Sequence, residues 1–155
     1  MKIYSNIETA KSELVDMMKT FPKHPYRVGT GEIIDSLSMD ELTLYSRELI
    51  PLFKEYPHWT LEFKTKSDCV DQFLDMGPVD NIHVSWSINP PFIINSEEHG
   101  TARFEARMSA AKKVVKAGFK LAFHIDPIIY HENWKENYTY LVEQITKEFT
   151  PNEVK

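Results

Sequence analysis

Three segments of the chain alternate between apolar and polar residues, and this alternation restricts the folds that the chain can adopt. The segments are 61–66, 83–89 and 121–126, and the strands they contain are expected over 61–65, 82–88 and 121–125. Successive side chains of a β-strand point to opposite faces, so each segment predicts a strand with one apolar and one polar face. The strands of a doubly wound sheet are buried on both faces and read as continuous apolar runs. The alternation therefore favours part of a β/α barrel, with helices on the apolar face and a polar interior.

Apolar residues three or four positions apart predict helices between the strands. The helices are expected over 7–18, 42–53, 68–74, 101–117 and 133–149, and a first strand over 26–28. The expected signals at their ends are Asn6, a Ser38–Glu41 capping box, a bend at Pro51, Gly118 and Asn133. Strands joined through helices in this way run parallel, with right-handed crossovers.

Four strands are too few to close a barrel, because eight strands tilted by about 36° are the usual solution. We therefore predict an α/β chain that forms a partial (incomplete) β/α barrel of about four parallel strands, as a single domain over residues 1–155. The first and last strands would leave open edges, which favour pairing. A homodimer, or a missing N-terminal segment, is the expected completion of the barrel.

Composition excludes several classes of protein. The chain has 42% hydrophobic and 26% charged residues, which is typical of a soluble globular protein. It has no run of roughly 18 apolar residues and no signal-peptide core after Met1, so we expect a cytoplasmic protein without a membrane span. A net charge of −5 argues against unspecific binding to nucleic acid. The one cysteine, Cys69, excludes an internal disulfide and any site built from several thiolates of this chain.

Polar residues follow the expected strands, at the edge of a parallel sheet where ligands usually bind. Gly31 lets the backbone pass close to a ligand, and the carboxylate of Glu32 can accept hydrogen bonds from an amine. Lys66 can pair with a ligand carboxylate or phosphate. Ser87 and Asn89 share a face and can bind a ribose or a carboxylate. Each residue also has a local explanation, as a flexible turn, an exposed lysine or a strand end.

His124, Asp126 and His131 suggest an alternative, a metal-dependent barrel hydrolase. The close ligand pairs of such enzymes, His-x-His and His-Glu-x-x-His, are absent from the sequence, so we expect no metal site. Cys69 is expected on a helix face, since no histidine pattern around it indicates a nucleophile.

Several motifs of the chain resemble the spore photoproduct lyase family of radical S-adenosylmethionine enzymes. The motifs are Trp86-Ser87-Ile88-Asn89, Gly100-Thr101 with Arg107, Lys116-Ala117-Gly118-Phe119, and Pro127-Ile128 with His131-Glu132 and Trp134. They occur in the same order and at nearly the same spacing in that family, and looser similarity covers most of residues 1–149. The resemblance implies a partial β/α barrel, in agreement with the polar interior expected from the strands.

The resemblance also implies a ligand and a reaction. Members of the family cleave S-adenosylmethionine reductively at a [4Fe–4S] cluster, and the adenosyl radical reverses a thymine dimer in spore DNA. By position, Gly31 and Glu32 resemble the turn that holds the methionine amino group. Lys66, Ser87 and Asn89 resemble the groups that hold the carboxylate and the ribose. DNA as a partner is implied by the resemblance alone.

Two features of the family pattern are missing from the chain. The Cys-x3-Cys-x2-Cys loop that holds the cluster would precede Met1, and one cysteine cannot replace three. The cysteine that donates hydrogen in the family's DNA-repair members aligns with Gly29 or Thr30. We therefore expect a fragment or degenerate member of the family that is inactive alone. The alternatives are a non-catalytic nucleotide-binding or scaffold module and the metal-dependent hydrolase.

Overall fold

The computed structural model describes residues 6–32 and 34–154, and its centre is one four-stranded parallel sheet. The strands are β1 (Arg27–Thr30), β2 (Thr60–Thr65), β3 (Val79–Ser87) and β4 (Phe119–His124), and they lie in the order β1-β2-β3-β4. Every neighbouring pair is parallel, which confirms the expected strands and their direction. Val154 adds one parallel bridge to β4. The predicted homodimer through the sheet edges stays a prediction.

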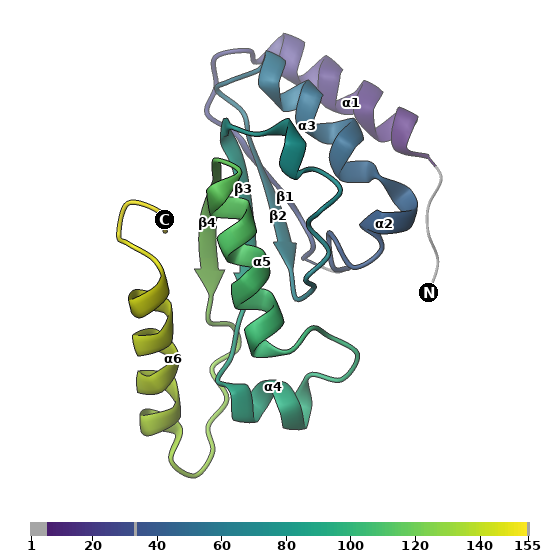
Figure 1. Cartoon of the computed structure of the whole chain (residues 1–155). Helices are drawn as coiled ribbons and strands as arrows, with labels where there is room; N and C mark the ends of the chain where they lie inside the picture. Colours follow the sequence, from purple (N-terminus) through teal and green to yellow (C-terminus); the bar gives the residue numbers. More distant parts are fainter. Residues whose placement is uncertain (1–5, 33, 155) are drawn as a thin grey trace.

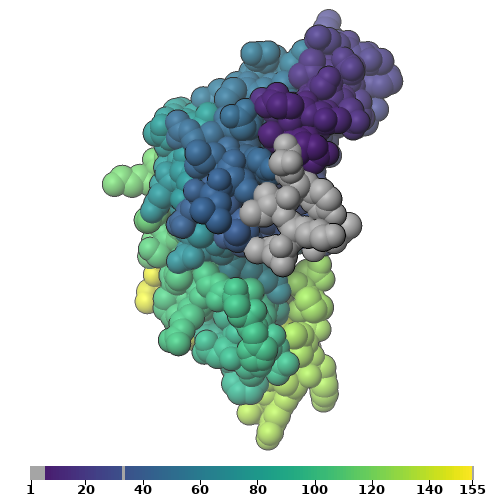
Figure 2. Space-filling model, turned by 90° about the vertical axis from the view of Figure 1, so that its right-hand side faces the viewer, coloured from purple at the N-terminus to yellow at the C-terminus, as the bar shows by residue number. Residues whose placement is uncertain are grey.

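The helices of the described residues are α1 (Ile7–Thr20), α2 (Asp40–Thr43), α3 (Tyr45–Glu55), the 3₁₀ helix η1 (Leu74–Met76), α4 (Pro91–Glu97), α5 (Phe104–Lys116) and α6 (Trp134–Glu148). In Figure 1, α3 and α5 lie over the sheet, and α4 lies beyond the carboxyl ends of the strands. α3 contacts β2 and β3, α5 contacts β3 and β4, and α1 packs on α3. Figure 2 shows α1 and the α2–α3 segment at one end of the molecule, and the α4–α5 segment and α6 at the other. None of the helices in the described ranges is long and apolar enough to cross a bilayer.

The two faces of the sheet differ as the alternation predicts. Leu61 and Val84 belong to the buried hydrophobic core, together with residues of α3 and α5. On the polar face, Glu62 of β2 forms an ion pair with Arg27 of β1, and its Oε1 lies 2.9 Å from Nε2 of His124 of β4. Polar side chains from three strands therefore meet on one face.

The segment 68–74, predicted as a helix, is irregular over 68–70 and forms a turn over 71–73 that leads into η1. Side chains bind the backbone at the start of this segment: the backbone N–H of Ser67 donates to Oγ1 of Thr65 (2.9 Å), and that of Cys69 donates to Oγ of Ser67 (3.1 Å). Such bonds compete with the bonds of a helix. Val70 is fully buried without a helix, so the apolar spacing here reflects the packing of a turn.

The predicted helix over 42–53 is interrupted. It is divided into α2 and α3 at Leu44, whose φ of 52° is left-handed. The buried carboxylate of Asp40 accepts hydrogen bonds across this break from the N–H (3.0 Å) and the hydroxyl (2.5 Å) of Ser46. Pro51 lies inside α3. The chain therefore changes direction at a buried polar contact, and Pro51 does not divide the two helices.

The expected signals at the helix ends are only partly confirmed. α1 follows Asn6 and α6 follows Asn133, but neither side chain makes a capping hydrogen bond. The Ser38–Glu41 capping box is wrong, because α2 follows Met39 without a side-chain cap. Gly118 follows Ala117, the C-cap of α5, and adopts a left-handed φ of 87°, as a helix-ending glycine does.

The connection between β3 and β4 contains two helices where the sequence predicted one. α4 begins at a Pro-Pro pair, which is well suited to a first helical turn. α5 begins after Thr101 and Ala102, because both residues donate hydrogen bonds to carbonyl groups outside this helix. The hydroxyl of Thr101 donates to the carbonyl of Glu98 (2.9 Å), and the N–H of Ala102 donates to the carbonyl of Lys66 (3.0 Å). The loop between α4 and α5 is thereby attached to the end of β2.

Candidate functional site

A small cavity of about 170 Å³ opens at the carboxyl ends of β1, β2 and β3. It is lined by Gly31, Ile34, Asp35, Lys64, Thr65, Lys66 and Ser87. Three of the five residues predicted to bind a ligand, Gly31, Lys66 and Ser87, therefore meet around one cavity. Parallel sheets commonly bind ligands at this edge.

Lys66 is held on three sides by other segments. Its N–H donates to Oδ2 of Asp35 (2.6 Å), and its carbonyl accepts from the N–H of Ala102 (3.0 Å). Its Nζ lies 3.2 Å from Oε1 of Glu98, and the side chain is 33% exposed. An ammonium group has three hydrogens, so a ligand can still bind to the two that Glu98 does not use.

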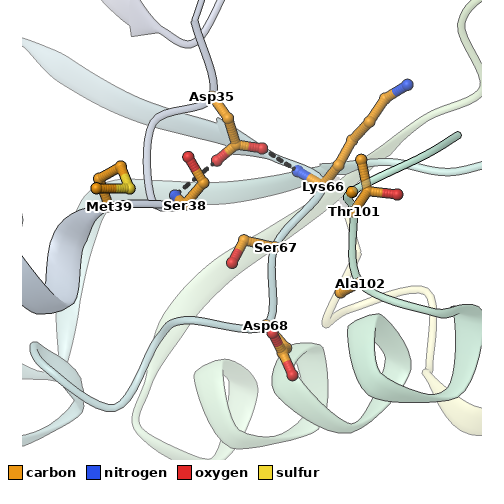
Figure 3. Close-up of a pocket in the computed structure, with 9 residues that line it drawn as sticks. Asp35, Ser38, Met39, Lys66, Ser67, Asp68, Thr101 and Ala102 are labelled. Atoms are coloured by element: carbon orange, nitrogen blue, oxygen red, sulfur yellow. Dashed lines mark hydrogen bonds between the residues drawn. The ribbon is translucent and has the colours of Figure 1, made fainter. Parts of the chain in front are cut away.

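Asp35 is a residue of the site that sequence reasoning missed. Its Oδ1 accepts hydrogen bonds from the N–H of Leu37 (2.9 Å), the N–H of Ser38 (2.9 Å) and the hydroxyl of Thr65 (2.7 Å). With the bond from Lys66, one carboxylate fastens the loop before α2 to the end of β2 (Figure 3). The Asp-Ser-Leu-Ser sequence is a signal for this turn, because aspartate often accepts from the N–H two residues later.

Glu98, the ion-pair partner of Lys66, also forms a buried ion pair with Arg107. Nη2 of Arg107 lies 2.7 Å from Oε2 of Glu98, and the Arg107 side chain is 0% exposed. The guanidinium also donates to the carbonyls of Ser87 (2.9 Å) and Ala102 (2.8 Å). Burial alone would raise the pKa of Glu98, but hydrogen bonds from Asn89 and Arg107 outweigh it and hold the pKa below its ordinary value. Glu98 is therefore ionised at neutral pH.

Asn89 is buried, and both ends of its amide already have a partner. Its Nδ2 donates to Oε1 of Glu98 (3.0 Å), and its Oδ1 accepts from the hydroxyl of Tyr138 in α6 (2.9 Å). The Tyr138 hydroxyl in turn accepts from the N–H of Ile129 (2.8 Å). One amide hydrogen of Asn89 is not used by these contacts. Asn89 does not line the cavity that Ser87 lines.

Gly31 and Glu32 have different positions relative to the cavity. Gly31 has a left-handed φ of 94°, and a Cβ there would clash with the carbonyl of Lys64 and lie 2.6 Å from Oγ of Ser36. Close packing on β2 therefore requires glycine at this position. The Glu32 side chain is 70% exposed and lies 3.7 Å from Nζ of Lys64. Glu32 is not one of the lining residues.

A larger cavity of about 530 Å³ lies beside the first. It is lined by Asp35, Ser38, Met39, Lys66, Ser67, Asp68, Gly100, Thr101 and Ala102. Asp35 and Lys66 separate the two cavities, because both residues line each of them. The Lys66 side chain points away from Ser67 and Asp68 (Figure 3). Its ammonium nitrogen lies 3.2 Å from Oε1 of Glu98.

Glu62 is the buried carboxylate of the polar face. Burial alone would raise its pKa, but hydrogen bonds from His124, Arg27 and Ser85 outweigh this effect and lower the pKa below its ordinary value. A carboxyl group with a lowered folded pKa stabilises the fold above its unfolded pKa of about 4.3. That contribution is lost as the pH falls through the folded value.

We expect Glu62→Gln to lower the free energy of unfolding by about 1–2 kcal/mol at about pH 7, because charged hydrogen bonds are lost. The difference in the free energy of unfolding between Glu62→Gln and the unsubstituted chain should shrink toward about pH 3, below the unfolded pKa. Urea unfolding at several pH values in this range measures this difference. Glu136→Gln, at an exposed position of α6, is the control and should show no such trend. A difference for Glu62→Gln that is independent of pH would contradict the prediction.

The residues of the hydrolase alternative do not form a metal site. Residues 6–32 and 34–154 contain no group of three His, Cys, Asp or Glu side chains that could hold a metal ion. His131 uses both ring nitrogens, toward the carbonyl of Ile129 (2.9 Å) and the amide of Asn137 (3.0 Å). Burial raises the pKa of the Cys69 thiol, which disfavours a nucleophilic thiolate.

The whole sequence matches a known protein family. The family model described as spore photoproduct lyase covers residues 1–155. The chain belongs to the spore photoproduct lyase family. The spore photoproduct lyase of Bacillus subtilis (strain 168) is 32% identical over 145 residues, which cover 94% of this chain and 42% of that protein. The spore photoproduct lyase of Geobacillus sp. (strain Y412MC61) is 33% identical over 114 residues, which cover 74% of this chain and 33% of that protein.

Solved structures of spore photoproduct lyases have the same fold. One mutant form has a TM-score of 0.90 and 27% identity, over 98% of this chain and 46% of that one. Another mutant, solved with bound AdoMet (S-adenosylmethionine) and dinucleoside spore photoproduct, has a TM-score of 0.88 and 26% identity, over the same shares. These similarities confirm the partial barrel of the radical S-adenosylmethionine type. The chain spans less than half the length of the spore photoproduct lyases it matches.

Proposed function

We propose that this chain binds S-adenosylmethionine at the carboxyl ends of β2 and β3, as the ligand-binding part of a spore photoproduct lyase-type barrel. The observation that supports it most is the position of Lys66. Lys66 lines a cavity that Gly31 and Ser87 also line, and two hydrogens of its ammonium group are not used by Glu98. A solved relative in this family has AdoMet bound.

In the proposed complex, the Lys66 ammonium group donates a charge-assisted hydrogen bond to the carboxylate of the methionine group. The Ser87 hydroxyl and the remaining amide hydrogen of Asn89 bind the ribose, and Glu32 moves toward the methionine amino group from its exposed position. When it is bound to enzymes of this family, S-adenosylmethionine supplies an adenosyl radical. The residues of the chain hold and orient the ligand, which limits the positions that its reacting bonds can take.

The donor set of the chain fits the ligand but not the iron–sulfur cluster. A [4Fe–4S] cluster needs several thiolates, and Cys69 is the one cysteine of the sequence. Gly29 and Thr30, which align with the hydrogen-donating cysteine, have no thiol. We therefore propose that the chain alone binds S-adenosylmethionine without cleaving it. Reversal of a DNA lesion would require the missing ligands from another polypeptide segment.

Calorimetric titration with S-adenosylmethionine tests the proposal. We expect saturable binding by the unsubstituted chain and about tenfold weaker binding by Lys66→Met, because one charged hydrogen bond is lost. Lys116→Met, at an exposed position of α5, is the matched control and should bind like the unsubstituted chain. Absence of saturable heat in the unsubstituted chain would overturn the proposed function. Equal affinity of the two lysine variants would remove Lys66 from the site.

A further inference from the structure

One carboxylate lies between two of the proposed ligand-binding residues. Oε1 of Glu98 is 3.2 Å from Nζ of Lys66 and 3.0 Å from Nδ2 of Asn89. These residues come from the ends of two different strands, β2 and β3. Glu98 lies just after α4 and is 5% exposed in its side chain. We infer that Glu98 is a positioning residue, which holds the Lys66 ammonium and the Asn89 amide in the arrangement that a ligand meets.

Glu98 can act in this way because its other oxygen is fixed. Oε2 accepts from Nη2 of Arg107 at 2.7 Å, and the same nitrogen donates to Oγ1 of Thr101 at 2.7 Å. Nε of Arg107 donates to the backbone carbonyl of Ala102, and Nη1 donates to that of Ser87. The guanidinium is therefore fixed by several contacts, and a bound guanidinium orients a carboxylate more strictly than a single charge would.

Positioning and simple charge have opposite consequences for anion binding. Glu98 places a negative charge beside Lys66, so its removal would strengthen the attraction of the site for any anion. A ligand that binds Lys66 and Asn89 together also depends on their relative arrangement. If Glu98 is a positioning residue, its loss weakens such a ligand although the site becomes more positive. A small symmetric anion such as inorganic phosphate does not need that arrangement.

The first experiment uses the chain without ligand. We expect Glu98→Gln to speed the exchange of the Lys66 ammonium hydrogens with water, measured by low-temperature ¹⁵N NMR and assigned with Lys66→Met. Glu97→Gln, at the exposed neighbouring position, is the control and should exchange like the unsubstituted chain. Equal exchange in the two glutamate variants would overturn the inference. This result does not depend on which ligand binds.

The second experiment measures binding and rests on the proposed function. We expect Glu98→Gln to bind S-adenosylmethionine about tenfold more weakly and inorganic phosphate equally or more tightly. In the Lys66→Met background, Glu98→Gln should have a smaller effect on S-adenosylmethionine. Weaker binding of both ligands would show that the residue is merely structural and would overturn the inference. If the unsubstituted chain does not bind S-adenosylmethionine, the proposed function fails and the NMR result decides the inference.

A second variant covers the case in which Glu98→Gln does not fold. Glu98→Gln/Arg107→Met removes both charges of the buried pair, and such replacements are often tolerated. Lys66 still loses its carboxylate in this variant. We expect faster exchange of the Lys66 ammonium hydrogens than in Arg107→Met alone, and equal exchange in the two would overturn the inference.

Discussion

Replacing Arg107 with methionine is expected to lower the free energy of unfolding by about 3–5 kcal/mol, the usual cost of breaking a buried ion pair from one side. The guanidinium is fully buried and donates to Glu98, Thr101 and two backbone carbonyls. Methionine fills a similar volume but leaves the Glu98 carboxylate buried with one charged partner fewer. Urea unfolding followed by circular dichroism measures the loss.

Arg103→Met is the matched control, because Arg103 is exposed at the start of α5 and its loss should change stability little. The double variant Glu98→Gln/Arg107→Met should lose less stability than Arg107→Met, since no uncompensated carboxylate remains. If Arg107→Met were as stable as Arg103→Met, the buried pair would contribute nothing to the fold.

Asp35→Asn is expected to lower the free energy of unfolding by about 3 kcal/mol, because the variant loses charge-assisted bonds to backbone N–H groups. Three N–H donors and the Thr65 hydroxyl meet this carboxylate. An asparagine can turn its oxygen toward the three groups that donate to Oδ1 of Asp35. Its NH₂ group then faces the N–H of Lys66, and two donors cannot form a hydrogen bond with each other. Thermal and urea unfolding measure the loss, and S-adenosylmethionine affinity should fall with it.

Asp68→Asn is the control for Asp35→Asn. Asp68 lines the same large cavity but is exposed, so its substitution should leave stability nearly unchanged. Equal unfolding curves for the two variants would mean that the bonds of Asp35 to the strand end do not stabilise the protein.

Much of the fold could be predicted from sequence because its signals are local. The alternation over 61–66 and 83–89 is a property of a single strand, and it correctly placed polar and apolar side chains on opposite faces. The helix expected at 68–74 does not form, because the hydroxyl groups of Thr65 and Ser67 accept hydrogen bonds from the backbone N–H groups of Ser67 and Cys69. That competition depends on side-chain geometry, which apolar spacing does not describe.

In the candidate site, too, residues with a local sequence signal could be predicted and long-range contacts could not. Lys66 and Ser87 could be predicted because each follows its own strand and both lie at the edge where parallel strands end. The turn at Asp35 has a local signal, but the contacts of Asp35 and Glu98 with Lys66 could not be predicted, because Lys66 is distant from both residues in sequence. Asp35 binds the backbone of Lys66 across 31 positions, and Glu98 meets Lys66 from another crossover. Contacts of this kind appear only when the chain is folded.

The double attachment of the Lys66 backbone has a consequence for local opening. Its N–H is bonded to the loop before α2 and its carbonyl to the loop between α4 and α5. Neither loop can move away from β2 without breaking a bond to the residue proposed to bind the ligand. The two loops and the strand end should therefore open together as one cooperative unit, and a ligand bound at Lys66 would slow the fluctuations of both loops.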